Sequence, residues 1–151
     1  MANTYSQLHF HVVFSVKNKA CSFSISELDS VFEVLRVVLL QEDVFPIVVG
    51  GYTDHIHALI NIKPKYSISN IMSNIKSKSN KFLKEKKHVK DNFEWQVGYS
   101  VFSISHNDVF SVRRYILDQK SHHQKLTFEE EYRKMLKDAE IEFDEKYLFD
   151  L

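Results

Sequence analysis

The chain has 151 residues and a mass of 17.8 kDa, which suits one compact domain, and its 44% hydrophobic and 26% charged residues exclude a mainly disordered chain. No stretch approaches the roughly 20 apolar residues of a membrane span, no secretory signal is visible, and a single cysteine, Cys21, excludes an internal disulfide, so we expect a cytoplasmic protein. The formal net charge of +0 conceals an asymmetry, because residues 1–126 carry 16 Lys and Arg against 11 Asp and Glu, whereas residues 127–151 carry 4 against 9.

The first half of the chain predicts a strand, a helix and two further strands. In residues 5–16 the apolar side chains recur with period two, which is typical of a strand with one buried face, and His9 and His11 fall on its other face. Residues 25–40 carry apolar side chains at helical spacing. Residues 45–52 and 55–62 then predict two strands joined by a tight connection.

The second half predicts helices on either side of one more strand. Residues 67–87 should form a long amphipathic helix with a lysine-rich exposed side, and residues 95–105 predict a strand. Asn107 or Asp108 can cap the next helix, and a short charged helix should follow Thr127. The apolar residues of the helix after Asp108 are Val109, Val112, Ile116 and Leu117.

This order of elements, β-α-β-β-α-β-α, predicts an α+β fold. We expect a ferredoxin-like antiparallel sheet with helices packed on a face, with the first and third strands as central neighbours. Such folds support many unrelated activities, so the function must be argued from particular residues.

The strand at 55–62 begins with a His-x-His motif. Residues i and i+2 of a strand point to the same face, so the imidazoles of His55 and His57 project together while Ile56 faces the core. Two adjacent imidazoles on a rigid strand make half of a metal site. The motif alone is weak, because a chain with 8 histidines contains such a pair by chance, and His9 and His11 form another.

A second group of polar residues lies on the helix after Asp108. Positions four apart share one stripe of a helix, so the Tyr115 hydroxyl and the Gln119 amide should lie on the same side, at the border of the buried face. A structural tyrosine is also common at such a border. His122 and His123 extend the polar region by a turn.

Several further motifs, in order along the chain, make the pattern specific. They are HVVFSVK, GGYTDHIHALI, ISNIMSNIKSKSNKFL, FEWQVGYSVFSIS, VRRYILDQKSHH and TFEEEYRKML. With them the chain resembles the small single-tyrosine HUH transposases of bacterial insertion sequences, including the repeat-associated tyrosine transposases. The resemblance implies that residues 1–126 form an HUH single-strand DNA transposase domain, with the acidic helix and tail at 127–151 as part of the same domain.

The resemblance also implies the roles of individual residues. His55 and His57 would be the metal ligands, Gln119 a further ligand, and Tyr115 the nucleophile that forms a 5′-phosphotyrosine link to DNA. Mg²⁺ or Mn²⁺ is the expected ion, a hairpin-bearing single strand the expected substrate, and a homodimer the expected assembly. Covalent catalysis keeps the phosphodiester energy for rejoining, so no nucleotide cofactor is expected, and no Walker-type glycine-rich loop is present in the sequence.

Basic residues supply the candidate DNA contacts. They are Lys76, Lys78, Lys81 and Lys84 on the long helix and Arg113 and Arg114 beside Tyr115. A solvated helix face explains the same lysines. His11 would lie next to the His-x-His strand, where it can support a metal ligand, contact DNA or simply pack.

Two other classes of function remain open from the sequence. A non-catalytic, ferredoxin-like module that binds single-stranded nucleic acid would have no need of the Tyr115 hydroxyl. The sequence also leaves open whether this copy moves an element or is retained by its host for another task. A metal sensor or metal-dependent hydrolase would need His55 and His57 and would form no covalent adduct.

Overall fold

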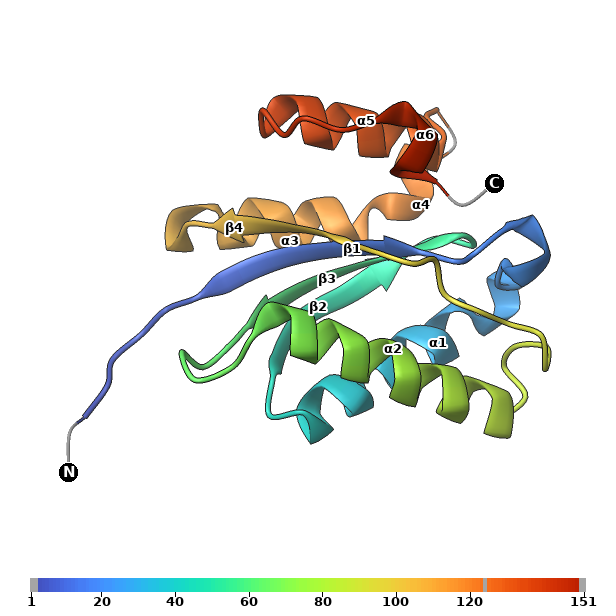
Figure 1. The fold of residues 1–151 in the computed structure, drawn as a ribbon, viewed down its shortest axis with the longest axis horizontal. Coiled ribbons are helices and arrows are strands. Elements are labelled where there is room, and N and C mark those ends of the chain that lie inside the picture. Colours follow the sequence, from blue (N-terminus) through green and yellow to red (C-terminus); the bar gives the residue numbers. More distant parts are fainter. Residues whose placement is uncertain (1–2, 124, 150–151) are drawn as a thin grey trace.

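The computed structural model describes residues 3–123 and 125–149, without the side chain of His122, so the end of the predicted tail lies outside the described residues (Figure 1). The strands are β1 (His9–Ser15), β2 (Phe45–Gly51), β3 (His55–Asn61) and β4 (Ser100–Ile104). The helices are α1 (Leu28–Gln41), α2 (Ile68–Glu85), α3 (Val109–Leu117), α4 (Gln119–His122), α5 (Phe128–Asp138) and α6 (Glu145–Leu148). Short 3₁₀ turns occupy Lys19–Cys21, Ile25–Glu27 and His106–Asp108.

The four strands form one antiparallel sheet in the order β2-β3-β1-β4. The prediction of an α+β, ferredoxin-like fold with the first and third strands at its centre is therefore confirmed. In the register of β1 against β3, Val13 lies opposite His57 and Ser15 lies opposite His55. Directly opposed residues share a face, so these four side chains point to the same side of the sheet.

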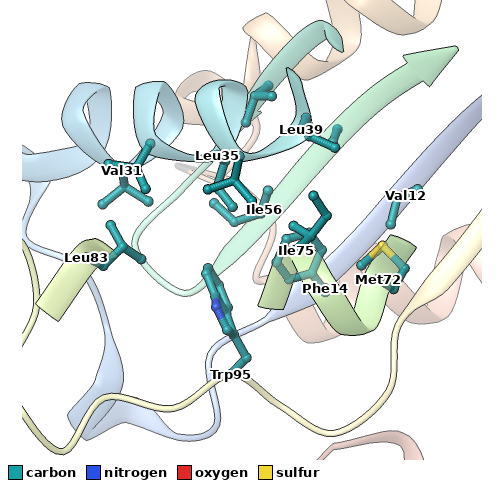
Figure 2. Close-up of a cluster of buried hydrophobic side chains, with 14 of the residues drawn as sticks. Val12, Phe14, Val31, Leu35, Leu39, Ile56, Met72, Ile75, Leu83 and Trp95 are labelled. Atoms are coloured by element: carbon teal, nitrogen blue, oxygen red, sulfur yellow. The ribbon is translucent and has the colours of Figure 1, made fainter. Parts of the chain in front are cut away.

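One face of the sheet carries the main hydrophobic core beneath α1 and α2. Helical spacing turns Val31 and Leu35 of α1 toward Ile75 of α2, and the period-two pattern of the strands adds Phe14 and Ile56 from the sheet (Figure 2). These side chains are at most a few per cent exposed. The core therefore supports β1 and β3 on the face opposite to His55 and His57.

The other face of the sheet is also covered, by α3, α4, α5 and α6 (Figure 1). Ile116 of α3 packs on Leu59, and Phe128 and Tyr132 of α5 pack on Val13. The helices predicted to pack on a face thus divide between two faces. The later helices enclose the side of the sheet from which His55 and His57 project.

Gly50 in β2 allows α3 to lie directly on the strand. A Cβ atom at this position would come within 2.8 Å of Cγ2 and 2.9 Å of the carbonyl oxygen of Ile116. Carbon atoms pack no closer than about 3.5 Å without strain. The missing side chain of Gly50 therefore sets the height of α3 above the sheet.

Three predicted boundaries are wrong. The strand predicted at 5–16 begins only at His9. The strand predicted at 95–105 begins only at Ser100, because Gly98 adopts φ +93° and Trp95 makes only an isolated bridge to Val16. The predicted helix through Tyr115 and Gln119 is interrupted at Asp118, where α3 ends. There the Ser121 amide bonds to the Asp118 carbonyl three residues earlier, which tightens the turn. Within the described residues, no helix has the length and apolar character required to cross a membrane.

Candidate active site

The His-x-His pair lies where the sequence places it, on the enclosed face of β3. His55 and His57 are completely buried, and Ile56 between them belongs to the core on the opposite face. The ring of Phe128 stacks on that of His55, with centroids 4.1 Å apart. The imidazoles are therefore held by the strand below and by α5 above.

A carboxylate and an amide from later helices meet the two imidazoles. Oε1 of Glu131 lies 3.2 Å from Nε2 of His57 and 3.5 Å from Nε2 of His55. Oε1 of Gln119 lies 2.9 Å from Nε2 of His55, and the Gln119 amide donates to Oε2 of Glu131 at 3.0 Å. Gln119 and Glu131 are both buried. Residues far apart in the sequence thus form one polar cluster inside an otherwise apolar layer.

The spacing of these atoms fits a divalent cation. The ligand atoms of His55, His57 and Glu131 all lie within 4.8 Å of one another. Two ligands about 2.1 Å from one ion stand about 3.0 Å apart at an octahedral angle and about 3.4 Å apart at a tetrahedral angle. The separations of 3.2 and 3.5 Å to Glu131 match these values. Two imidazole nitrogens and a carboxylate can hold Mn²⁺ and Zn²⁺ alike.

The outer nitrogens of both imidazoles also have partners. The carboxylate of Asp54 lies 2.7 Å from Nδ1 of His55, and this hydrogen bond holds the pKa of Asp54 below its usual value, although burial alone would raise it. Nε2 of His11 lies 2.7 Å from Nδ1 of His57. Such contacts fix the tautomer of a ligand histidine. If the Nδ1 proton of His55 is donated to Asp54, the lone pair of Nε2 faces the Gln119 oxygen, and a cation between these two acceptors would bind both.

Tyr115 reaches this cluster from α3 within the same chain. Its hydroxyl donates a hydrogen bond to Oε2 of Glu131, and its ring lies edge-on to that of His57 with centroids 5.8 Å apart. The side chain is half-buried, so its hydroxyl stands between the enclosed cluster and solvent. Burial and the Glu131 carboxylate raise the pKa of Tyr115 above its usual value, so the phenol stays protonated in this arrangement.

The cluster keeps one carboxylate ionised among neutral imidazoles. Burial lowers the pKa of His57 from 6.5 to about 4 and that of His11 to about 3. Burial would raise the pKa of Glu131, but hydrogen bonds from His123 and His57 outweigh it and hold the pKa well below its usual value. A negative oxygen therefore faces neutral imidazole nitrogens, which is the state in which these groups bind a metal ion.

Of the remaining histidines with described side chains, His123 belongs to the cluster and His9 does not. Nε2 of His123 lies 2.9 Å from Oε1 of Gln119 and 3.2 Å from Oε1 of Glu131, and its ring stacks on that of Tyr52. His9 stacks instead on His106, and among the described residues its buried ring nitrogens have no hydrogen-bond partner. The side chain of His122 lies outside the described structure.

The basic residues predicted to contact DNA are not gathered around this cluster. Lys76, Lys78, Lys81 and Lys84 lie on α2, on the opposite face of the sheet from α3 to α6 (Figure 1). The ammonium of Lys76 donates to the carbonyl oxygens of Gln96 and Gly98, and that of Lys78 pairs with Glu42. Arg113 and Arg114 lie on exposed positions of α3 next to Tyr115, so they are nearer to the cluster than the lysines.

Sequence reasoning missed Glu131, although the sequence contains a signal for it. The buried residues of α5 include Phe128, Tyr132 and Leu136, and Glu131 occupies the same stripe of an otherwise charged helix. A carboxylate on an apolar stripe must find a polar partner when the helix packs. Glu131 stands in a run of three glutamates, which conceals this one position among exposed neighbours. Asp54 was also missed, whereas His123 was expected in the polar region without an assigned role.

Comparison with known proteins gives consistent matches. Residues 4–119 match the protein family described as IS200-like transposases. The transposase for insertion sequence element IS200 of Salmonella typhimurium is 29% identical over 124 residues, which cover 79% of this chain and 81% of the relative, and that of Salmonella typhi matches equally.

Solved structures support the fold. A candidate transposase from Deinococcus radiodurans R1 superposes with a TM-score of 0.59 at 18% identity, covering 79% of this chain and 95% of that one. A REP-associated tyrosine transposase, determined bound to a REP hairpin, superposes with a TM-score of 0.58 at 13% identity, covering 82% of this chain and 73% of that one.

Proposed function

Because this chain belongs to the family of IS200-like transposases, we propose that it cleaves and rejoins single-stranded DNA at hairpin-marked ends, with Tyr115 as the nucleophile. The observation that carries the proposal is the meeting of three elements in one chain. The Tyr115 hydroxyl of α3 bonds to Glu131 of α5, whose other oxygen lies 3.2 Å from His57 of β3. A metal sensor would not require a phenol at this place.

His55, His57 and Glu131 would hold the divalent ion, with Gln119 beside them as a fourth ligand through its amide oxygen. When bound, the ion supplies Lewis-acid polarisation of the scissile phosphate. Mg²⁺ or Mn²⁺ is the proposed ion, and the two imidazole nitrogens favour Mn²⁺ of the two. When the ion is bound, Asp54 and His11 would accept the Nδ1 protons of the two imidazoles, which leaves the lone pair of each Nε2 for the ion.

The covalent step exchanges one phosphate ester for another. The Tyr115 oxygen attacks phosphorus, the bond from phosphorus to the 3′ oxygen of the upstream nucleotide breaks, and that oxygen takes up a proton to leave a free 3′-OH. Oε2 of Glu131 already accepts the hydrogen bond of the phenol, so it is placed to receive the phenolic proton. The downstream strand remains on the enzyme as a 5′-phosphotyrosine, and attack by another 3′-OH reverses the step.

The proposed substrate is a hairpin-bearing single strand. The REP-associated relative of similar fold is bound to a REP hairpin, which supports this class of DNA. Arg113 and Arg114 are the basic side chains beside the nucleophile and are proposed to contact backbone phosphates. The lysines of α2 would then meet only DNA that extends around the edge of the sheet. We retain a homodimer as the proposed assembly, with each active site formed within one subunit.

A doubly labelled oligonucleotide tests the proposal. A single strand from the flanks of the gene carries one dye at its 5′ end and another at its 3′ end, and is incubated with the protein in Mn²⁺ or in EDTA. The account predicts that the 3′ label migrates with the protein on a denaturing gel while the 5′ label appears on a shorter strand with a free 3′-OH. EDTA and Tyr115→Phe should both abolish the adduct.

Each competing function predicts a different pattern of bands on this gel. Tyr147 is largely exposed on α6, so Tyr147→Phe is a matched control that should form the adduct normally. Metal-dependent cleavage without an adduct would identify a hydrolase. Binding without cleavage, unchanged by Tyr115→Phe, would identify a non-catalytic module or a copy retained by its host for another task.

A further inference from the structure

A cavity of about 620 Å³ opens beside the nucleophile, between the segment from α3 to α4 and the helix α5. Tyr115 and Glu131 form the wall that it shares with the polar cluster. The residues that the argument below uses from its remaining lining are Lys125, Leu126, Lys134 and Met135. None of these four has a role in the proposed chemistry.

This cavity is where the reactive phenol meets open space. His55, His57 and Gln119 are completely buried, whereas Tyr115 is half-buried and lines the cavity. A phosphodiester that approaches the Tyr115 oxygen from this side must bring its neighbouring nucleotide with it. The lining of the cavity should therefore suit a nucleotide.

The lining has the two parts that a nucleotide requires. Leu126 and Met135 are half-buried and offer an apolar surface, and the flexible thioether of methionine packs well against flat aromatic rings. Lys125 and Lys134 are exposed at the rim, where ammonium groups can meet a phosphate. Lys134 also bonds to Asp138 at 3.0 Å, which leaves Lys125 as the better phosphate partner. The volume lies within the range of about 300–1,000 Å³ that is usual for pockets of small ligands.

We propose that this cavity binds the unstacked nucleotide that adjoins the scissile phosphate, with its base against Leu126 and Met135 and its backbone phosphate facing Lys125. The inference rests on the proposed function and adds a nucleotide-binding site to it. Enzymes that modify a base take that nucleotide out of the stack and hold it in a pocket, and we infer a similar arrangement here. The contacts here are apolar, so they favour a base of any kind over an abasic position.

Abasic substitution tests the inference separately from catalysis. Four versions of the hairpin-bearing strand each lack one base, at the second or first position on either side of the scissile phosphate. Their affinities for Tyr115→Phe protein are measured by fluorescence anisotropy in Mn²⁺. We expect removal of the base at one of the two positions that adjoin the phosphate to lower the affinity at least about fivefold, which corresponds to about 1 kcal/mol.

A double-mutant cycle assigns that loss to the cavity. In the Met135→Ala background the same base removal should cost less than about twofold, because the contact is already lost. Leu126→Ser provides a second background if Met135→Ala unfolds at a much lower temperature than the wild type. The thermal unfolding of both variants is measured. Lys125→Ala should weaken binding of every strand, whereas Lys120→Ala, a lysine on the exposed side of α4, should leave it unchanged.

An equal penalty at all four positions, or a full penalty that persists in both cavity variants, would overturn the inference. If the wild-type protein forms the adduct and yet shows such a pattern, the nucleotide site is wrong and the proposed function stands. If no adduct forms on the intact strand and none of the strands binds, both fail.

Discussion

The hydroxyl of Tyr115 donates its hydrogen bond to Oε2 of Glu131, and this contact joins the proposed nucleophile to the imidazoles that are proposed to bind the metal ion. Oε1 of the same carboxylate faces Nε2 of His57 at 3.2 Å. One side chain of α5 therefore touches both the group that is proposed to attack DNA and the groups that are proposed to hold the ion.

Glu131→Gln should weaken metal binding by at least about tenfold, because the amide keeps the shape of the side chain and removes the negative charge. Isothermal titration with Mn²⁺ measures the change. Glu129→Gln, on an exposed position of the same helix, is the matched control and should bind as the wild type does. Equal Mn²⁺ affinities for the wild type and Glu131→Gln would show that Glu131 is not a metal ligand.

The metal-free protein should lose stability as the pH falls from 7.5 to 5. The pKa values of His57 and His11 are lowered to about 4 and about 3 in the folded protein. Below pH 6.5 these imidazoles therefore bind protons in the unfolded chain but not in the folded chain, which favours unfolding. Each such imidazole lowers the free energy of unfolding by up to about 1.4 kcal/mol per pH unit. Urea unfolding in EDTA measures the slope, which should flatten in the double variant His11→Asn, His57→Asn. A slope already flat in the wild type contradicts the neutral, buried state of these rings.

Gly50→Ala should displace α3 and with it Tyr115. Its Cβ would meet Ile116 at 2.8 Å, and overpacking of this kind costs about 1–3 kcal/mol of unfolding free energy. We expect a lower rate of adduct formation with Mn²⁺ affinity nearly retained, since His55, His57 and Glu131 do not lie on α3. A variant with normal adduct formation would show that the height of α3 above β2 does not position the nucleophile.

Co-expressed variants distinguish an active site within one chain from a site shared between chains. Tyr115 approaches His57 in the same chain, so a mixture of Tyr115→Phe and His57→Ala subunits should stay inactive, because no chain holds both groups. Separate affinity tags on the two variants allow the mixed dimer to be purified before the adduct assay. Recovery to a substantial fraction of wild-type adduct would demonstrate that Tyr115 serves the partner subunit.

Periodicity was sufficient to predict the sheet and the main helices. The alternation in β1 and β3 separates His55 and His57 from Ile56, and the same alternation holds in the structure. The strand predicted from residue 95 shows the limit of this reasoning. Its alternating pattern continues through Gly98, where the positive φ angle ends the pairing that side-chain character alone suggests.

The candidate site was only partly predictable for a physical reason. The spacing of His55 and His57, and of Tyr115 and Gln119, is fixed by local geometry that a sequence reveals. The position of Glu131 depends on how α5 docks on the sheet through Phe128 and Tyr132, and no local spacing specifies that docking. The lysine-rich side of α2 was equally visible in the sequence, but only the fold shows that it lies behind the sheet.

Mass spectrometry of the trapped complex tests the central claim most directly. The protein is incubated with the hairpin-bearing strand and Mn²⁺, denatured, digested with nuclease and protease, and searched for a nucleotide on any side chain. The account predicts a nucleotide 5′-phosphate on Tyr115 and on none of the other six tyrosines of the sequence. A nucleotide on a different residue, or a cleaved strand that carries a free 5′ phosphate and leaves Tyr115 unmodified, would contradict it.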